Sequence, residues 1–347
     1  MITDIPNVVE KINENLPDQI QMWGYAKVVK TFHSKTLCDS RIYEYLIPSY
    51  VFMHSSPSSL STPNTQPILT AEGYTLKKET ERLVSPGETP LISQDSTIVH
   101  ISLEDIPVAT AEEMIEKRKY RIPPDTLETV RQGFRIYEGT HNYHNYTIGR
   151  SAKDKSCFRY IIKFEVSDPK IIQNTEWLSL KVHGQSFMLH QIRKMVSMIV
   201  LVVRSGTPLS LVEKTFDLDK INIPKAPALG LLLEQPVFNS YNKKAKEKEK
   251  DLVSFELYKE KIDKFKDEFI YSKIFAEEIE ENTFQNWLNV IDYHTARDYG
   301  YLNVEGIIPE SAIIKTGEKI HKGKIIVKDD EDNGINKEED DDSFSEE

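Results

Sequence analysis

The sequence predicts a protein that contains both helices and strands, and three stretches carry this prediction. Apolar residues recur at the spacing of one helical face at Leu189, Ile192, Val196, Ile199 and Val203. Residues 41–47 alternate as in a half-buried strand, with Tyr43 and Tyr45 on one face. Residues 158–166 and 177–183 have the β-branched and aromatic content of strands, and the second of these leads directly into the helical stretch.

The helical stretch, which the pattern extends from Gly184 to Arg204, also has a basic side that carries His190, Arg193 and Lys194. A buried helix whose cations reach solvent at one edge explains this side as well as a binding surface does. A membrane span is excluded, because a charge in hydrocarbon costs several kcal/mol. The uncharged run after Lys194 is also shorter than the roughly 20 residues that a span needs.

Composition and cysteine content favour a soluble protein in a reducing compartment. The chain has 347 residues, of which 39% are hydrophobic and 29% charged, enough for one large or two modest domains. The first residues carry neither a basic nor an apolar signal segment, so secretion is not expected. Cys38 and Cys157 are the two cysteines and form no CxxC pair, which argues against a zinc site built from cysteines.

The negative charge of the chain is concentrated at its end. The net charge is -11, and residues 329–347 hold eleven acidic residues and one lysine, a net of -10. The difference leaves -1 for residues 1–328. We therefore expect a disordered acidic tail at 329–347 and a nearly neutral body, which does not exclude a polyanionic partner.

The remaining elements follow from local patterns. We expect helices at 5–15, 110–119 and 126–137, a strand at 20–29, a Ser/Pro/Thr-rich insertion or loop at 54–97, and a rigid loop entering a buried strand at 221–233. A lysine and glutamate run at 243–250 opens a charged helical extension over 243–328, expected to pack along the main domain. Its exposed lysines could touch a polyanion, although solvation alone explains most of them. His141 and His144 form an H-x-x-H pair without nearby acidic or cysteine partners, so no metal site is predicted, and a structural metal is not excluded.

Six ordered blocks of the sequence resemble the TruA-type tRNA pseudouridine synthase family, and most closely its fungal nuclear members. The blocks are Phe32-His33-Ser34-Lys35, Arg41-Ile42-Tyr43-Glu44-Tyr45, residues 137–146 (YEGTHNYHNY), Arg159-Tyr160-Ile161, residues 185–195 (QSFMLHQIRKM) and residues 224–231 (PKAPALGL). The resemblance covers about residues 5–242 and the charged extension.

The resemblance implies the α+β pseudouridine synthase fold, in which two lobes share a largely antiparallel mixed sheet flanked by helices, with an RNA cleft between them. It also implies isomerisation of uridine to pseudouridine in tRNA, and possibly other RNAs, without a cofactor. That reaction breaks the N1–C1′ bond, turns the base and rejoins it through C5. It needs a flipped uridine, a carboxylate at the sugar and a stacking group that helps to move a proton.

The resemblance also implies roles for individual residues. Tyr43 matches the active-site tyrosine of the family, whose ring stacks on uracil while its hydroxyl reaches a proton. Arg159 matches the basic residue that pairs with the catalytic aspartate. Candidates for phosphate contacts are Lys35, Arg41, His190, Arg193, Lys194 and Lys225.

The sequence departs from the family at the catalytic aspartate. The family motif, Gly-Arg-Thr-Asp followed by Gly-Val-His, occurs nowhere in this chain, and Thr3-Asp4 does not match its context. We therefore expect an incomplete first lobe, with residues 1–50 as its remnant and residues 98–242 as the second lobe. The expected activity then depends on a segment that precedes Met1, and residues 1–347 alone are predicted to be inactive. The alternative is a non-catalytic RNA-binding protein derived from the same fold.

By the same resemblance, the expected location is the nucleus, with the cytoplasm as the alternative. The expected partner is tRNA. Neither a membrane nor an obligatory protein partner is indicated by the sequence.

Overall fold

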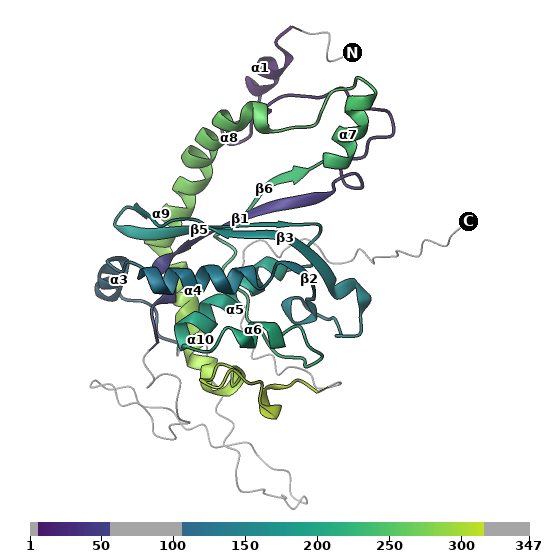
Figure 1. The fold of residues 1–347 in the computed structure, drawn as a ribbon. Coiled ribbons are helices and arrows are strands. Elements are labelled where there is room, and N and C mark those ends of the chain that lie inside the picture. Colours follow the sequence, from purple (N-terminus) through teal and green to yellow (C-terminus); the bar gives the residue numbers. More distant parts are fainter. Residues whose placement is uncertain (1–5, 56–105, 316–347) are drawn as a thin grey trace, which may run out of the picture.

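The computed structural model describes residues 6–55 and 106–315, without the side chains of 294–298 (Figure 1). The predicted acidic tail lies outside the described residues, as does the predicted insertion apart from its first two residues. The helices are α1 (Val8–Asn13), α3 (Ala111–Arg118), α4 (Pro124–Arg135), α5 (Gln191–Ser205), α6 (Ser210–Lys214), α7 (Asn239–Glu247), α8 (Lys259–Phe265), α9 (Ser272–Glu281) and α10 (Thr283–Asp298), with the π-helical turn η7 (Lys266–Tyr271) between α8 and α9. The strands are β1 (Ser40–Pro48), β2 (Gly139–Asn142), β3 (Phe158–Val166), β4 (Lys170–Ile172), β5 (Thr175–Gly184) and β6 (Leu231–Val237). The short 3-10 helices are η2 (Ser49–Phe52), η4 (His144–Tyr146), η5 (Lys155–Cys157), η6 (Glu256–Tyr258) and η8 (Glu310–Ala312).

The strands of the described chain form one sheet in the order β2-β3-β5-β1-β6, with β4 paired to β5. All of these pairings are antiparallel. The expectation of an α+β protein with a largely antiparallel sheet is therefore confirmed. The register places Tyr43 opposite Val182 and Arg41 opposite Gly184. The start of β1 and the end of β5 therefore lie side by side, at the same end of these two central strands.

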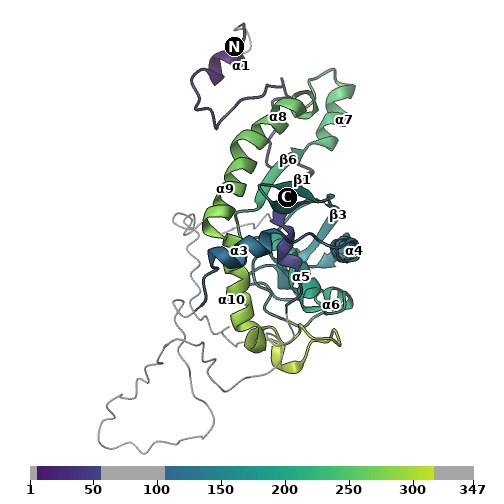
Figure 2. The same ribbon diagram turned by 90° about the vertical axis from the view of Figure 1, so that its left-hand side faces the viewer.

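One face of the sheet holds the main core. Tyr45, Leu180 and Val182 point to this face and are buried, as period-two alternation along β1 and β5 requires. They meet α4 and α5, and α5 is buried over nearly its whole length. Figure 2 shows α4, α5 and α6 on this side of the sheet and the α8–α9 arm rising on the other.

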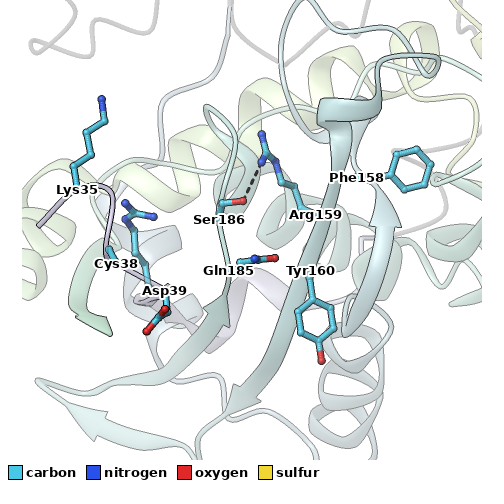
Figure 3. A pocket seen from close by; sticks show the side chains of 9 residues that line it. Lys35, Cys38, Asp39, Phe158, Arg159, Tyr160, Gln185 and Ser186 are labelled. Atoms are coloured by element: carbon cyan, nitrogen blue, oxygen red, sulfur yellow. Dashed lines mark hydrogen bonds between the residues drawn. The ribbon is translucent and has the colours of Figure 1, made fainter. Parts of the chain in front are cut away.

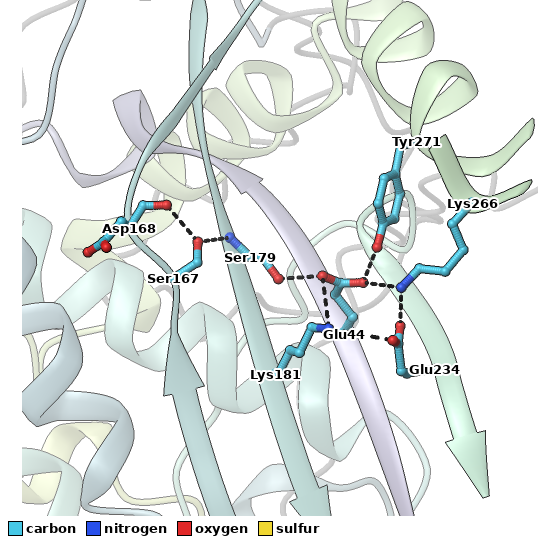
Figure 4. A network of polar contacts seen from close by, with 8 residues as sticks. All are labelled: Glu44, Ser167, Asp168, Ser179, Lys181, Glu234, Lys266 and Tyr271. Carbon is cyan, nitrogen blue, oxygen red and sulfur yellow. Dashed lines mark hydrogen bonds and ion pairs between the residues drawn. The ribbon is translucent and has the colours of Figure 1, made fainter. Parts of the chain in front are cut away.

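The opposite face of the sheet carries a buried polar network that ties the charged extension to β1 (Figure 4). The carboxylate of Glu44 on β1 accepts hydrogen bonds from Ser179 and Tyr271, and the Lys266 ammonium lies 3.3 Å away. Lys266 also donates to Glu234 at 2.5 Å. Burial raises the pKa of Glu44, but its hydrogen bonds and the neighbouring lysines lower that pKa overall. The extension therefore packs along the main domain, as expected, through ionised side chains that are buried but paired.

The expected strand at 20–29 is wrong. These residues have no strand or helix assignment and run along the extension instead. The ring of Trp23 meets the edge of Phe265 at 5.3 Å, and the backbone N–H of Lys27 donates to Asp251 at 2.7 Å. A Cβ atom on Gly24 would lie 2.0 Å from the Tyr258 hydroxyl, so this contact requires glycine. The β-like residues lack a ladder partner, and side-chain packing fixes the segment in its place.

The sheet joins segments that the sequence assigned to different lobes. β1, assigned to the first lobe, pairs with β5 and β6 of the second. Helix α7 crosses the boundary placed between residues 242 and 243. No helix within the described residues is long and apolar enough to cross a membrane.

Candidate functional site

A cavity of about 490 Å³ opens where β1, β3 and β5 come together (Figure 3). Its lining consists of Lys35, Cys38, Asp39, Arg41, Phe158, Arg159, Tyr160, Gln185 and Ser186. The antiparallel register creates it, because the start of β1 and the end of β5 lie side by side. The N–H of Gln185 donates to the carbonyl of Tyr160 at 3.0 Å and holds the loop after β5 against β3.

Three cations converge on this cavity from separate segments, namely Lys35, Arg41 and Arg159. The side chains of Lys35 and Arg41 have no ion pair or hydrogen bond with the described part of the chain. The carboxylate of Asp39, also in the lining, accepts from the backbone N–H of Ser240 at 2.7 Å. With three cations and one carboxylate, the cavity favours an anionic ligand.

Arg159 is held in the wall of the cavity by one side chain. Its Nη1 donates to the Ser186 hydroxyl at 2.9 Å, and Figure 3 shows the two groups turned toward each other. Its Nε atom is buried and has no hydrogen-bond partner within the described residues. A buried donor without an acceptor costs about 1–3 kcal/mol, so this guanidinium still has the capacity to bind a carboxylate or phosphate.

Tyr43 lies beside the cavity and does not line it. It is partly buried, and its ring meets the edge of Phe187 with centroids 5.2 Å apart. Phe187 directly follows Ser186, so the loop after β5 contacts Arg159 through one residue and Tyr43 through the next. Because a Cβ atom on Gly184 would lie 2.6 Å from the Phe187 ring, glycine is needed for this ring to lie over the strand.

The basic stretch that the sequence suggested is not one continuous helix. β5 extends to Gly184, and α5 begins at Gln191. His190 adopts a left-handed conformation, with φ of 62°, and the Gln191 side chain accepts from the N–H of Met188 at 2.9 Å. Leu189 is 64% exposed, so it does not belong to the apolar face.

Lys194 is not at the surface, where a contact with phosphate would require it to be. The side chain is buried, and its ammonium donates to the carbonyls of Asn145 and Thr147 at 3.2 and 3.1 Å. Burial, together with the charges of Lys220 and Lys225, lowers the pKa of Lys194 to about 7. Lys194 therefore ties the η4 segment to α5.

The remaining cations of the helical stretch, and Lys225, also lie outside the cavity lining. Arg193 donates from Nε to the carbonyl of Ala226 at 2.7 Å, and His190 is half-buried. Lys225 is exposed next to Ala226. Arg204 makes a bidentate ion pair with Asp292 on α10, with N–O distances of 2.5 and 2.6 Å. The structure therefore gathers Lys35, Arg41 and Arg159 and leaves the other predicted contacts apart.

Sequence reasoning assigned no role to five residues of the cavity lining, Cys38, Phe158, Tyr160, Gln185 and Ser186, nor to Phe187 beside Tyr43. Gln185, Ser186 and Phe187 stood inside the expected helix, and their roles depend on the late start of α5 at Gln191, which leaves them in the loop after β5. The available signal was Gly184, which ends the strand and favours a bend.

The histidine pair has structural contacts. His141 stacks on Phe216 at 4.3 Å, and His144 is fully buried. Among the described residues, no group of three or more His, Cys, Asp or Glu side chains is placed to hold a metal ion. Cys38 and Cys157 are both free thiols.

The fold and site define an α+β protein with an antiparallel sheet and a cationic cavity that favours an anionic ligand. Residues 134–239 match the family model described as tRNA pseudouridine synthase. The chain is 39% identical over 360 residues to tRNA pseudouridine synthase 1 of Yarrowia lipolytica, covering 96% of this chain and 68% of that protein. It is 36% identical to tRNA pseudouridine synthase 1 of Saccharomyces cerevisiae, covering 93% of this chain and 62% of the relative. It is 31% identical to the human pseudouridylate synthase 1 homolog, covering 84% and 55%. The chain belongs to the tRNA pseudouridine synthase family.

The chain spans only part of these relatives. It covers 68% of the Yarrowia protein but 57% and 53% of the Candida glabrata and Candida albicans relatives. The alignments that show family membership include most of this chain, but only a little more than half of the length of several relatives.

Proposed function

We propose that this chain binds tRNA, and other RNAs that present an unstacked uridine, as the substrate-binding part of a pseudouridine synthase. The observation that carries the proposal is the convergence of Lys35, Arg41 and Arg159 on one cavity in a chain of this family. Phosphate charge dominates the affinity of proteins for nucleic acid, and three cations with one engaged carboxylate supply an attractive field.

In the proposed reaction, the uridine leaves its stack and its ring lies against Tyr43 at the side of the cavity. The phenol then offers one face for stacking and a hydroxyl for the proton at C5. Arg159 would hold the catalytic carboxylate, and its unpaired buried Nε supports that assignment. The isomerisation exchanges a C–N bond for a C–C bond within one nucleoside and so needs no redox or group-transfer cofactor.

Asp39, which lines the cavity, and Asp154 are the alternatives for the nucleophile within this chain. Asp39 accepts a hydrogen bond from Ser240 at the start of α7. Asp154 accepts from the N–H of Ser156 at 2.8 Å and pairs with Arg150 at 3.0 Å. Because neither pairs with Arg159, these contacts support a carboxylate from outside this sequence, so residues 1–347 should bind tRNA without converting it.

Two assays on purified residues 1–347 test the proposal. Filter binding with unmodified tRNA should give binding that weakens steeply with salt. Carbodiimide treatment followed by reverse transcription should give no stops above background. Robust stops would show that a carboxylate of this chain is the nucleophile, and Asp39→Asn and Asp154→Asn would then identify it. The absence of tRNA binding at low salt would refute the proposal.

A non-catalytic RNA-binding protein is the second candidate, because Arg159 has no carboxylate partner within the described residues. The natural full-length transcript separates the candidates. An in-frame Gly-Arg-Thr-Asp motif upstream supports the synthase, and its absence supports the binding module. We further propose a nuclear site of action, which rests on the resemblance to the fungal nuclear members.

A further inference from the structure

A cluster of lysines lies on and just after helix α7, outside the cavity. It consists of Lys243, Lys244, Lys246, Lys248 and Lys250, all exposed, and is called the α7 lysine cluster below. None of the five ammonium groups has an ion pair or hydrogen bond with the described residues. Exposed lysines elsewhere in the chain do form pairs, as Lys119 does with Glu116 at 2.7 Å and Lys163 with Glu165 at 2.6 Å.

The five lysines are unpaired within the described residues even though carboxylates lie close to them in the sequence. Glu247 and Glu249 are interleaved with the lysines and are exposed. Lys243 and Glu247 have the i,i+4 spacing that allows pairing on a helix, although Lys before Glu is the weaker order. Five lysines and two glutamates leave three positive charges on this short segment.

The helix that presents these lysines is fixed to the wall of the cavity. The N–H of Asp39 donates to the carbonyl of Val237 at 2.9 Å, and its carboxylate accepts from Ser240 at 2.7 Å. The inner side of α7 is buried at Tyr241, which meets Phe32 at 4.7 Å. The same residue of the chain, Asp39, therefore lines the cavity and anchors the first turn of α7.

The chain that follows α7 is tied back to the first turn of the helix. The Asn242 side chain donates to the carbonyl of Val253 and accepts from its N–H, both at 2.8 Å. Because the first turn of α7 is anchored to the cavity wall and to the chain that follows the helix, the lysines lie on a defined surface of an element that contacts the cavity wall.

We propose that the α7 lysine cluster binds the phosphate backbone of the RNA whose uridine enters the cavity. This inference rests on the proposed function and adds a second contact region for the same RNA. Charge complementarity selects the occupant, because lysines act as flexible point charges suited to phosphates. The contact should be independent of sequence, since phosphates position a nucleic acid without reading its bases.

The test compares full-chain variants in tRNA binding measured across a salt series. In the cluster variant, Lys243, Lys244 and Lys246 are replaced by glutamine. The matched control replaces Lys119, directly after α3, Lys170 on β4 and Lys273 on α9, all of which are exposed. The cluster variant should show a salt slope shallower by about 0.7–0.9 for each phosphate that it no longer neutralises, and the control should keep the parental slope. Thermal melting should be the same for all three proteins, because the replaced side chains are exposed.

The outcomes separate this inference from the proposed function. If Arg41→Gln flattens the salt slope and the cluster variant does not, the cluster is not an RNA contact while the function stands. If the parental chain does not bind tRNA, the proposed function itself fails. If the cluster variant loses binding to poly-L-glutamate but not to tRNA, the surface belongs to an acidic protein partner and the inference is overturned.

Discussion

The hydroxyl of Tyr50 donates a hydrogen bond to the carboxylate of Glu278, although the two residues are 228 positions apart. Tyr50 follows β1 in η2, and Glu278 lies on α9 of the extension. Both are buried. This hydrogen bond fixes the extension against the core at a second point, beyond the Glu44 network, and makes the attachment sensitive to pH.

Glu278 should make stability fall as pH rises. Burial raises its pKa to about 7, against hydrogen bonds from Tyr50 and Phe284 that lower it. Between an unfolded pKa near 4.5 and this folded value, the folded state binds more protons, so its stability is lost as pH rises through 7. Glu278→Gln should remove this pH dependence, which amounts to about 3 kcal/mol in the free energy of unfolding. Urea unfolding of both proteins across the pH range measures the difference. Parallel stability curves would contradict the assignment.

Replacing Lys266 should release the extension from β1. Lys266→Met leaves Glu44 and Glu234 with less compensation in a site where Glu44 is 3% exposed. Breaking a buried ion pair by removing one partner costs about 3–5 kcal/mol. Chemical denaturation measures the loss. The matched control is Lys264→Met, an exposed residue one half-turn away, which should change stability by less than about 0.5 kcal/mol.

Lys194 should matter for stability and not for RNA. Lys194→Met removes two hydrogen bonds to backbone carbonyls and should cost about 1–2 kcal/mol at alkaline pH. Since burial depresses the folded pKa to about 7, the wild-type advantage should shrink as pH falls from about 10 toward 7. The salt slope of tRNA binding should stay parental, in contrast to Arg41→Gln. A flatter slope for Lys194→Met would place this ammonium on RNA after all.

Tyr43→Phe should separate chemistry from folding. The Tyr43 hydroxyl has no hydrogen bond with the described residues, and its ring contact with Phe187 survives the change. Melting temperature and tRNA affinity should therefore be unchanged for residues 1–347. In a form of the protein that converts tRNA, turnover should fall by about a hundredfold or more, the usual effect of losing an acid or base group. Parental turnover would remove Tyr43 from the mechanism, and Tyr43→Ala serves as the control for the ring contact.

Several elements could be predicted from the local alternation of apolar and polar residues alone. β3 coincides with the predicted strand at 158–166, and β1 contains the predicted 41–47. Helices α3 and α4 lie within two residues of their expected bounds. These segments combine a clear period with turn residues at their ends, so propensity and tertiary packing favour the same conformation.

Which cations form a site depends on long-range contacts that no local pattern contains. Arg41 and Lys194 are equally basic in sequence, but Arg41 lies at a strand end that opens on the cavity, whereas the carbonyls of Asn145 and Thr147 draw Lys194 inward. The segment at 20–29 has strand-like residues but packs on the extension, because a ladder needs a partner strand. Local pattern determines which face of an element is apolar. The long-range partner determines whether a polar group on the other face meets solvent, a counter-charge or a backbone carbonyl.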